Sequence, residues 1–405
     1  MRPPRLEAGN PDYALLATAM ALVVIGVIFV YSSSFAIALA HYDDINYFFF
    51  RQIFAAALGL GALIFFMSID YHRLRVFSPI IMLGAVVSLA AVLFIGSDAY
   101  GARRWIDFGP MPFQPSEFAK LALIIYISAW LASYRRDLTS FGSGFMPFIF
   151  AVGVVAALIM MEPDTGTTAV IVATTLALFF IAGGSLVHVI TLGCTGLVAG
   201  VLLILTEGYR AQRLLAFTSA ESDPDGLGFQ TLQLLIALGS GGLEGLGLGV
   251  SRQKFFYIPG AHTDGIFAII GEEVGFIGAM IVIGLFAYLV YRGFRVAMRA
   301  HDDFGTYLAM GVTCWIAFQT LVNLGGITRS IPLTGIPLPF VSYGGSSLIM
   351  VMAGIGVLLS VSRYGRESAP ERRPARRQAQ QVRRRQAVPQ PEPAMSARMT
   401  EGQST

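Results

Sequence analysis

The sequence predicts an all-helical membrane protein, a polytopic bundle of about ten transmembrane helices with a long extracytoplasmic loop between the seventh and eighth. Three observations predict this fold. The 405 residues are 55% hydrophobic and only 13% charged, with a mean hydropathy of +0.65, whereas soluble domains contain about 25% charged residues. Continuous apolar runs of spanning length recur along the chain. No alternating strand pattern appears, so a spanning backbone must satisfy its own hydrogen bonds as helix.

The first apolar run, from about Tyr13 to Ser34, follows Arg2 and Arg5 and precedes small residues that imitate a signal-peptide cleavage site. A signal-peptide core is about 7 to 15 residues long, whereas a membrane span needs about 20. We therefore expect residues 1–12 to be a short tail and this run to be an uncleaved first helix. The ten runs lie near residues 13–34, 48–68, 76–96, 116–133, 144–161, 166–183, 185–205, 265–291, 304–325 and 340–362.

Arginine counts predict the orientation of the transmembrane domain, residues 13–362. Ten spans place both chain ends on one side, where the N-terminal tail and short loops hold nine arginines. The short loops of the other side hold only Arg103, Arg104 and Arg329. The positive-inside rule therefore places both termini in the cytoplasm. Residues 363–405 contain ten arginines and no apolar period, which predicts a disordered basic cytoplasmic tail.

Several kinds of site and architecture find no support in the sequence. Cys194 and Cys314 both lie inside apolar runs, so neither a disulfide framework nor a cysteine metal site is indicated. No internal repeat is visible, so sequence symmetry does not support an inverted-repeat transporter.

The outward segment at residues 101–120 combines a basic pair and a tryptophan with a Glu and a Lys in the first turns of a spanning helix. Because this Glu and Lys are three residues apart, they share a helix face and can pair. Two interpretations remain open. The segment is either an interfacial anchor with a helix-terminal carboxylate or a positive pocket for phosphates. The residues concerned are Arg103, Arg104, Trp105, Glu117 and Lys120.

A tight outward turn at Glu162–Gly166 places two carboxylates between two spans. Its Pro and Gly account for the turn. Asp164 is in position to cap the following helix, and it also brings a second acid to the outward face.

The long outward loop, Thr206–Asp264, has 59 residues, and loops of this length usually have a function. It contains Arg210 and a short apolar helix expected around Thr231–Leu238, followed by a glycine run at Gly239–Gly249. Since no strand precedes the glycines and the rest of the fingerprint is absent, the sequence does not support a dinucleotide site. We expect the glycines to permit close backbone packing.

Asp264 ends this loop directly before an apolar run, close to Lys254, His262 and Thr263. A carboxylate at the mouth of a membrane bundle can hold a proton or a cation beside a lipid-borne substrate, or it can cap the helix that starts at Gly265. The spacing matches no zinc motif. A divalent cation, Mg²⁺ or Mn²⁺, bridging the carboxylate to a pyrophosphate is chemically compatible with the sequence.

The segment Ile331–Ser347 carries three prolines and a glycine that exclude regular helix from Pro332 to Pro339. Irregular backbone at membrane depth is tolerated where it lines a cavity or is buried in protein. A structural re-entrant turn and a substrate-lining segment fit the sequence equally well.

Taken together, these segments resemble the SEDS family (shape, elongation, division and sporulation), which includes FtsW and RodA. The resemblance covers nearly the whole membrane region, in order, through GARRWIDFG, QPSEFAK, EPDTGTT, the GSGG to SRQK loop, AHTDGIFAIIGEEVGFIG and PLTGIPLPFVSYGGSS. It implies a glycosyltransferase of the bacterial cytoplasmic membrane that polymerises lipid II on the outer face. The implied partners are a class B penicillin-binding protein and other division or elongation proteins, with no nucleic acid.

The resemblance also implies the site. Asp264 matches the essential acidic residue of the family, and Arg104, Trp105, Glu117, Lys120 and Asp164 fall on its polar cavity. Arg103, Arg210 and Lys254 are further candidate cations for the substrate, beside His262 and Thr263. The chain has Gly260 where many members have Glu, and Gly265 where they have Phe. SRQKFFYIP and the basic tail look like FtsW and TGIPLP looks more like RodA, so an FtsW-like protein is expected.

The implied reaction inverts the anomeric carbon of a donor carried on undecaprenyl pyrophosphate. One carboxylate can serve as its base, because pyrophosphate leaves as a stabilised anion without the acid that a glycosidase needs; Asp264 is the candidate.

An alternative is a lipid II flippase, which needs ionisable groups along a path through the bilayer. A third is a scaffold that recruits the penicillin-binding protein, which leaves the acid and base cluster unexplained.

Overall fold

The structure, a computed structural model, describes residues 9–99, 102–107, 109, 111–133, 138–206, 217, 227–255 and 257–364. Among these residues, eight helices are long and apolar enough to cross a membrane. The other two expected spans coincide with α6 and α7, whose described apolar parts are shorter. A polytopic helical membrane fold is therefore confirmed, and the count of ten stays a prediction. The helices are α1 (Tyr13–Tyr42), α2 (Tyr47–Ser68), α3 (His72–Ile95), α4 (Pro115–Ser133), the π-helix η1 (Phe141–Phe145), α5 (Met146–Met161), α6 (Thr165–Ile181), α7 (Leu186–Thr206), α9 (Leu227–Ser240), α10 (Ile266–Met298), α11 (Asp303–Ile327) and α12 (Gly345–Arg363).

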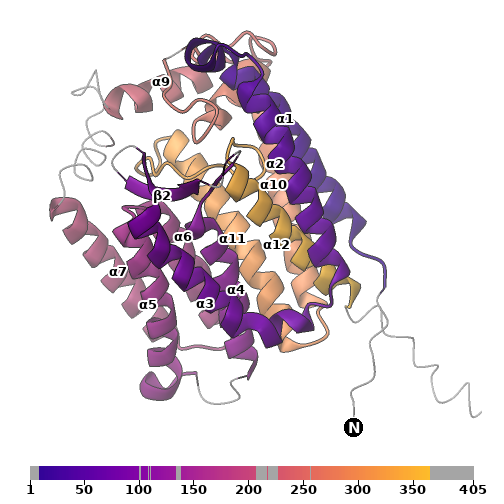
Figure 1. The fold of residues 1–405 in the computed structure, drawn as a ribbon, viewed down its shortest axis with the longest axis vertical. Helices are drawn as coiled ribbons and strands as arrows, with labels where there is room; N and C mark the ends of the chain where they lie inside the picture. The colour runs from indigo at the N-terminus through magenta and orange to yellow at the C-terminus, as the bar shows by residue number, and fades with distance from the viewer. Residues whose placement is uncertain are drawn as a thin grey trace, which may run out of the picture. The chain divides into compact units, whose positions relative to one another are not determined.

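Helices α4, α11 and α12 form the centre of the bundle (Figure 1). Between 61% and 78% of their apolar windows is buried, compared with 28% to 44% in the other candidate spans. The largest fully buried side chain, Trp315, lies on α11. The outer helices therefore expose apolar side chains to lipid, whereas these three contact mainly protein.

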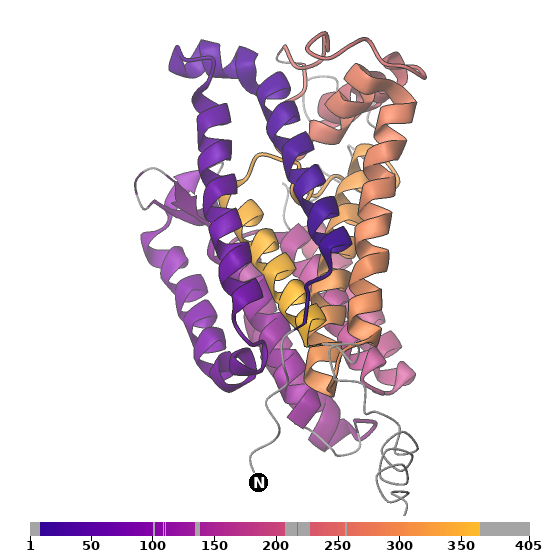
Figure 2. The ribbon, with the colours of Figure 1, turned by 90° about the vertical axis from the view of Figure 1, so that its right-hand side faces the viewer.

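Both ends of the described chain lie at the same end of the bundle. The Gly9 amide donates to the carbonyl oxygen of Arg363 at 2.8 Å, and the Asp12 amide donates to Ser362 Oγ at 3.1 Å. Figure 2 shows the start of α1 beside the end of α12. This arrangement is the one expected of an even number of spans. Most of the basic tail, residues 365–405, lies outside the described residues.

A small antiparallel sheet between α3 and α4 was not expected from the sequence. It consists of β1 (Ser97–Ala99), β2 (Ala102–Asp107) and β3 (Pro112–Phe113), paired in the order β1-β2-β3. Because it lies outside the apolar spans, its edges need not be satisfied in lipid. The sheet fixes the position of the basic pair Arg103 and Arg104.

Three helix boundaries differ from the sequence expectation by several residues. Helix α1 continues to Tyr42 and α10 to Met298, while α12 begins only at Gly345. Near the predicted end of α1, the polar side chain of Ser33 is satisfied by its own helix, because its Oγ donates to the Phe29 carbonyl oxygen at 2.6 Å. The start of α12 is delayed by Phe340, whose φ of 64° is not helical.

The glycine run of the long loop packs against a break in α10. At Gly275 the helix has a φ of 68°, and the loop enters there: the Leu246 amide donates to Glu272 O at 3.0 Å, and the Phe276 amide donates to Gly242 O at 2.9 Å. A Cβ at Gly241 would lie 2.0 Å from Gly271 O. Close backbone packing by the glycines is thus confirmed. The short helix predicted around Thr231–Leu238 is also present, as part of α9 (Leu227–Ser240).

Candidate active-site cavity

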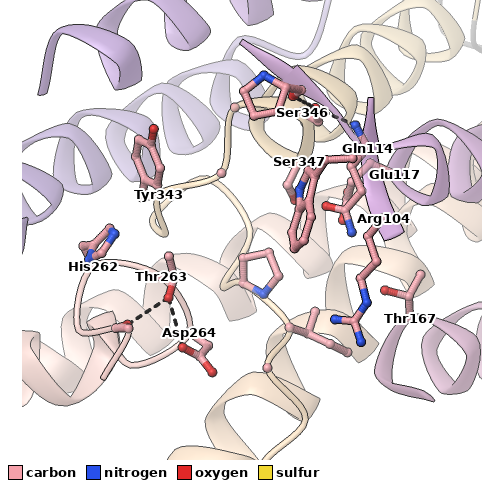
Figure 3. Close-up of a pocket in the computed structure, with 18 of the residues that line it drawn as sticks. Arg104, Gln114, Glu117, Thr167, His262, Thr263, Asp264, Tyr343, Ser346 and Ser347 are labelled. Carbon is pink, nitrogen blue, oxygen red and sulfur yellow. Dashed lines mark hydrogen bonds between the residues drawn. The ribbon is translucent and has the colours of Figure 1, made fainter. Parts of the chain in front are cut away.

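A cavity of about 570 Å³ opens where β2, the starts of α4, α6 and α12, and the loop before α10 meet. The irregular segment at residues 334–337 forms part of its wall. Figure 3 shows Arg104 and Thr167 facing Asp264 across this space. Of the sequence-predicted site residues, seven line the cavity: Arg104, Trp105, Glu117, Asp164, His262, Thr263 and Asp264.

Asp264 is partly buried and lies one residue before Gly265, the N-cap of α10. Its Oδ1 is 3.1 Å from Thr263 Oγ1, which is also 3.0 Å from the carbonyl oxygen of Gly260. The N-cap position itself is thus held by the glycine, and the carboxylate of Asp264 lines the cavity.

Gly260 allows the loop to turn tightly beneath that carboxylate. Its φ of 71° is the left-handed conformation that favours glycine. A Cβ at this position would lie 2.7 Å from Oδ1 of Asp264. This chain therefore has glycine, where many family members have glutamate, at a position where the backbone brings residue 260 very close to the aspartate.

Two amide side chains of α11 hold the irregular segment. Asn323 Nδ2 donates to the carbonyl oxygens of both Asp264, at 3.0 Å, and Ile336, at 2.8 Å. One turn earlier, Gln319 Nε2 donates to Pro337 O at 3.0 Å. These amides satisfy buried carbonyls that a helix would have paired internally. Neither was singled out from the sequence, because their partners are on other elements.

Arg104 reaches the cavity from β2 and is held by backbone. Its Nε donates to Glu162 O at 2.8 Å and its Nη2 donates to Pro163 O at 2.7 Å. Asp164, in the same turn, caps α6: its Oδ1 accepts from the Thr167 amide at 2.9 Å and its Oδ2 accepts from Thr167 Oγ1 at 2.8 Å. The capping interpretation of Asp164 is confirmed, and the residue also lines the cavity.

Glu162 is fully buried in this turn, and neither carboxyl oxygen has a hydrogen-bond partner in the part of the chain that the structure describes. Burial and, to a smaller extent, the nearby Asp164 charge raise the pKa of Glu162, Arg104 opposes the rise, and the net value is about 8. Glu162 is therefore largely neutral at pH 7.

We expect Glu162→Gln to stabilise the protein at pH 7 by about 1 to 3 kcal/mol, since each pKa unit corresponds to about 1.4 kcal/mol. Between pH 4.5 and about 8 the folded state binds a proton that the unfolded state has released. Stability is therefore lost as pH rises through this window. Thermal melting of both proteins from pH 4.5 to 8 is the measurement, and the gain should vanish at pH 4.5. Parallel pH curves would contradict the raised pKa.

The pairing of Glu117 and Lys120 predicted from their spacing is present, with Nζ 2.8 Å from Oε1 and both residues buried. Lys120 Nζ also donates to Gln319 Oε1 at 2.8 Å. Glu117 lines the cavity and Lys120 does not. Within the described chain, Oε2 of Glu117 is buried and has no hydrogen-bond partner.

The remaining predicted cations lie elsewhere. Lys254 forms an ion pair with Glu273 at 2.8 Å, and both side chains are fully buried outside the cavity lining. Ser32 Oγ of α1 also donates to Glu273, at 2.7 Å. Arg103 is exposed and does not line the cavity. Arg210 lies outside the described residues.

His262 is buried, and burial lowers its pKa to about 4. The imidazole is therefore neutral at pH 7 and packs against the rings of Phe48 and Tyr343. Its carbonyl oxygen accepts from the Tyr343 amide at 2.9 Å. His262 thus contributes shape and hydrogen bonding to the cavity rather than positive charge.

Arg51 is a cavity residue that the sequence analysis did not single out. It projects from α2, and its guanidinium carbon lies 4.8 Å from the centre of the Tyr47 ring. An ionisable residue inside an apolar run is itself a signal of function, so it could have been found. Tyr343, Ser346 and Ser347 also line the cavity and belong to the segment Ile331–Ser347, for which a substrate-lining role was one of two interpretations. Lining residues that were not singled out are Gln114, Thr167 and Gln230.

Comparison with known proteins places these features in a family. Residues 13–367 match the model of the FtsW, RodA and SpoVE cell cycle proteins. The chain is 43% identical over 359 residues to stage V sporulation protein E of Bacillus subtilis, covering 88% of this chain and 98% of that protein. It is 38% identical over 353 residues to a probable peptidoglycan glycosyltransferase FtsW of Trichlorobacter lovleyi, covering 87% and 93%.

Solved structures agree with this placement. The crystal structure of the rod shape determining protein RodA of Thermus thermophilus matches with a TM-score of 0.65 at 27% identity, covering 88% of this chain and 98% of that one. A chain of a peptidoglycan synthase complex that coordinates polymerization and crosslinking matches with a TM-score of 0.71 at 27% identity, covering 89% and 99%.

Proposed function

The chain belongs to the FtsW, RodA and SpoVE family of cell cycle proteins, and we propose on this basis that it is a peptidoglycan glycosyltransferase that polymerises lipid II. The observation that carries the proposal is one cavity that presents the Asp264 carboxylate together with the guanidinium groups of Arg51 and Arg104. A base for a sugar hydroxyl and cations for a pyrophosphate are the two requirements of this reaction. The sequence similarity to SpoVE and FtsW proteins supports an FtsW-like member.

In the proposed reaction, the 4-hydroxyl oxygen of the acceptor sugar attacks the anomeric carbon of the donor. Asp264 takes the hydroxyl proton, and the bond to undecaprenyl pyrophosphate breaks with its electron pair leaving on the phosphate oxygen. A positioned base contributes about 10² to 10⁴ in rate. Arg104, oriented by two carbonyl oxygens before substrate arrives, stabilises the charge that develops on the leaving group.

The cavity lies at one end of the bundle, formed by the starts of α4, α6 and α12 and by the loop before α10. This grouping supports an enzyme that works at one membrane face more than a translocase. We propose the outer face, because the arginine-rich loops and both chain ends lie on the opposite side. A class B penicillin-binding protein is the proposed partner, as a structural neighbour belongs to a peptidoglycan synthase complex.

A divalent cation remains an additional proposal. Mg²⁺ binds through one or two carboxylates plus substrate phosphates, and Asp264 would be the ligand. In the described part of the chain, no group of three or more His, Cys, Asp or Glu side chains could hold a cation without substrate. Asp264 would then bind the cation instead of accepting a proton. Polymerisation assays with and without EDTA distinguish these two roles, because only the first requires the cation.

The proposed function is tested by incubating the reconstituted protein with purified lipid II, alone and with a class B penicillin-binding protein. We expect glycan strands, with undecaprenyl pyrophosphate released in equal amount to the bonds formed. Transfer of lipid II between leaflets is measured in the same vesicles. Translocation without polymer, in the presence of the partner, would replace the enzyme with a flippase.

Asn323 is expected to hold the base in position. Asn323→Asp keeps the shape but cannot donate to the carbonyls of Asp264 and Ile336, so we expect kcat to fall by about 10²-fold, as a shift of about 1 Å can do, with KM little changed. Thr320→Val is the control, since that hydroxyl bonds only within its own helix, to Ile316 O. Asn323→Ala, which buries no new charge, should show the same kcat loss. A folded Asn323→Ala variant with normal kcat would refute the positioning role.

A further inference from the structure

A second cavity, of about 180 Å³, lies at the ends of α10 and α12 remote from the proposed active site. It is bounded by the segment before α1, the last turns of α10 and the last turn of α12. Its lining residues are Asn10, Pro11, Asp12, Arg292, Arg295, Val296, Arg299 and Ser362.

The charge of this cavity is positive. Arg292, Arg295 and Arg299 occur three and four residues apart on α10 and so share one helix face. Asp12 is the one carboxylate among the described lining residues, and it already accepts from Arg292 through Oδ2 and caps α1 through Oδ1. Among the described lining residues, three guanidinium groups thus stand beside one carboxylate.

Exposed tyrosines mark the depth of this cavity in the membrane. Tyr13, at the start of α1, is 62% exposed, and Tyr288 and Tyr291, on α10, are 43% and 53% exposed. Tyrosine rings concentrate at the level of lipid headgroups. The guanidinium of Arg295 lies 5.8 Å from the centre of the Tyr291 ring. The positive cavity is thus at headgroup depth.

We propose that this cavity binds the phosphate of an anionic phospholipid headgroup, from the leaflet on the side of the chain ends. Guanidinium groups bind phosphate oxygens by charge-assisted hydrogen bonds, and basic pockets at the membrane surface select anionic lipids. A bound headgroup would join the start of α1 to the ends of α10 and α12. The inference is independent of the proposed glycosyltransferase activity.

The test compares wild type with an Arg295→Gln/Arg299→Gln double variant in lipid nanodiscs. Phosphatidylglycerol should raise the wild-type melting temperature above its value in phosphatidylcholine and remain bound in native mass spectrometry. The double variant should lose most of that shift and bind phosphatidylglycerol at least tenfold more weakly, since each basic residue contributes about a factor of five near the surface. Arg73→Gln is the control, an exposed arginine on α3 that does not line the cavity.

Three results would overturn the proposal. If phosphatidylglycerol raised the melting temperature of wild type and of the double variant equally, the arginines would only stabilise the C-terminus of α10. The site would be assigned to a free anion if inorganic phosphate, added to wild type in phosphatidylcholine, raised the melting temperature as much as phosphatidylglycerol does. Loss of the shift in Arg73→Gln as well would make the effect one of total surface charge.

Discussion

Replacing Asp264 by Asn is expected to abolish glycan formation from lipid II, with a rate loss of about 10² to 10⁴. The amide keeps the size of the side chain and its contact with Thr263, but it cannot accept the proton of the attacking hydroxyl. Because the lost step is chemical, lipid II binding and the melting temperature should change little. The measurement is polymer yield from reconstituted protein with the penicillin-binding partner present.

Glu244→Gln provides the matched control for this variant. Glu244 is an exposed carboxylate of the same outward loop and does not line the cavity, so its neutralisation should leave the polymerisation rate unchanged. If a folded Asp264→Asn protein polymerised at the wild-type rate, the base would have to be another group. Glu117, with one oxygen that lacks a partner in the described chain, would be the next candidate.

Replacing Lys254 by Met is expected to destabilise the protein by about 3 to 5 kcal/mol, because it leaves the fully buried carboxylate of Glu273 without its counter-charge. The pair connects the long loop to α10, and Ser32 joins it from α1. Thermal melting in the same detergent measures the loss.

A double variant decides whether Lys254 acts through structure or through substrate. Lys254→Met combined with Glu273→Gln removes both charges and keeps an acceptor for Ser32, so most of the lost stability and activity should return. A single variant that melts like wild type but no longer binds lipid II would contradict the structural role and restore Lys254 as a substrate cation.

The apolar runs predicted the membrane helices well because a spanning segment satisfies its backbone locally. The prolines of the segment before Tyr343 likewise excluded helix from residues 332–339, and none is present there. The small sheet escaped prediction because β2 is short and depends on pairing with β1 and β3. Periodicity within one segment cannot reveal such pairing.

Sequence by itself determined the helical membrane class, the long loop before α10 and the position of Asp264 at the end of that loop. Only the tertiary structure decided which ionisable groups face the cavity and which face each other. Lys120 bonds to Gln319, 199 positions away, while Arg51 of α2 joins the wall with Arg104. A buried charge takes the nearest partner in space, because desolvation penalises leaving it alone. That partner is fixed by how the helices pack.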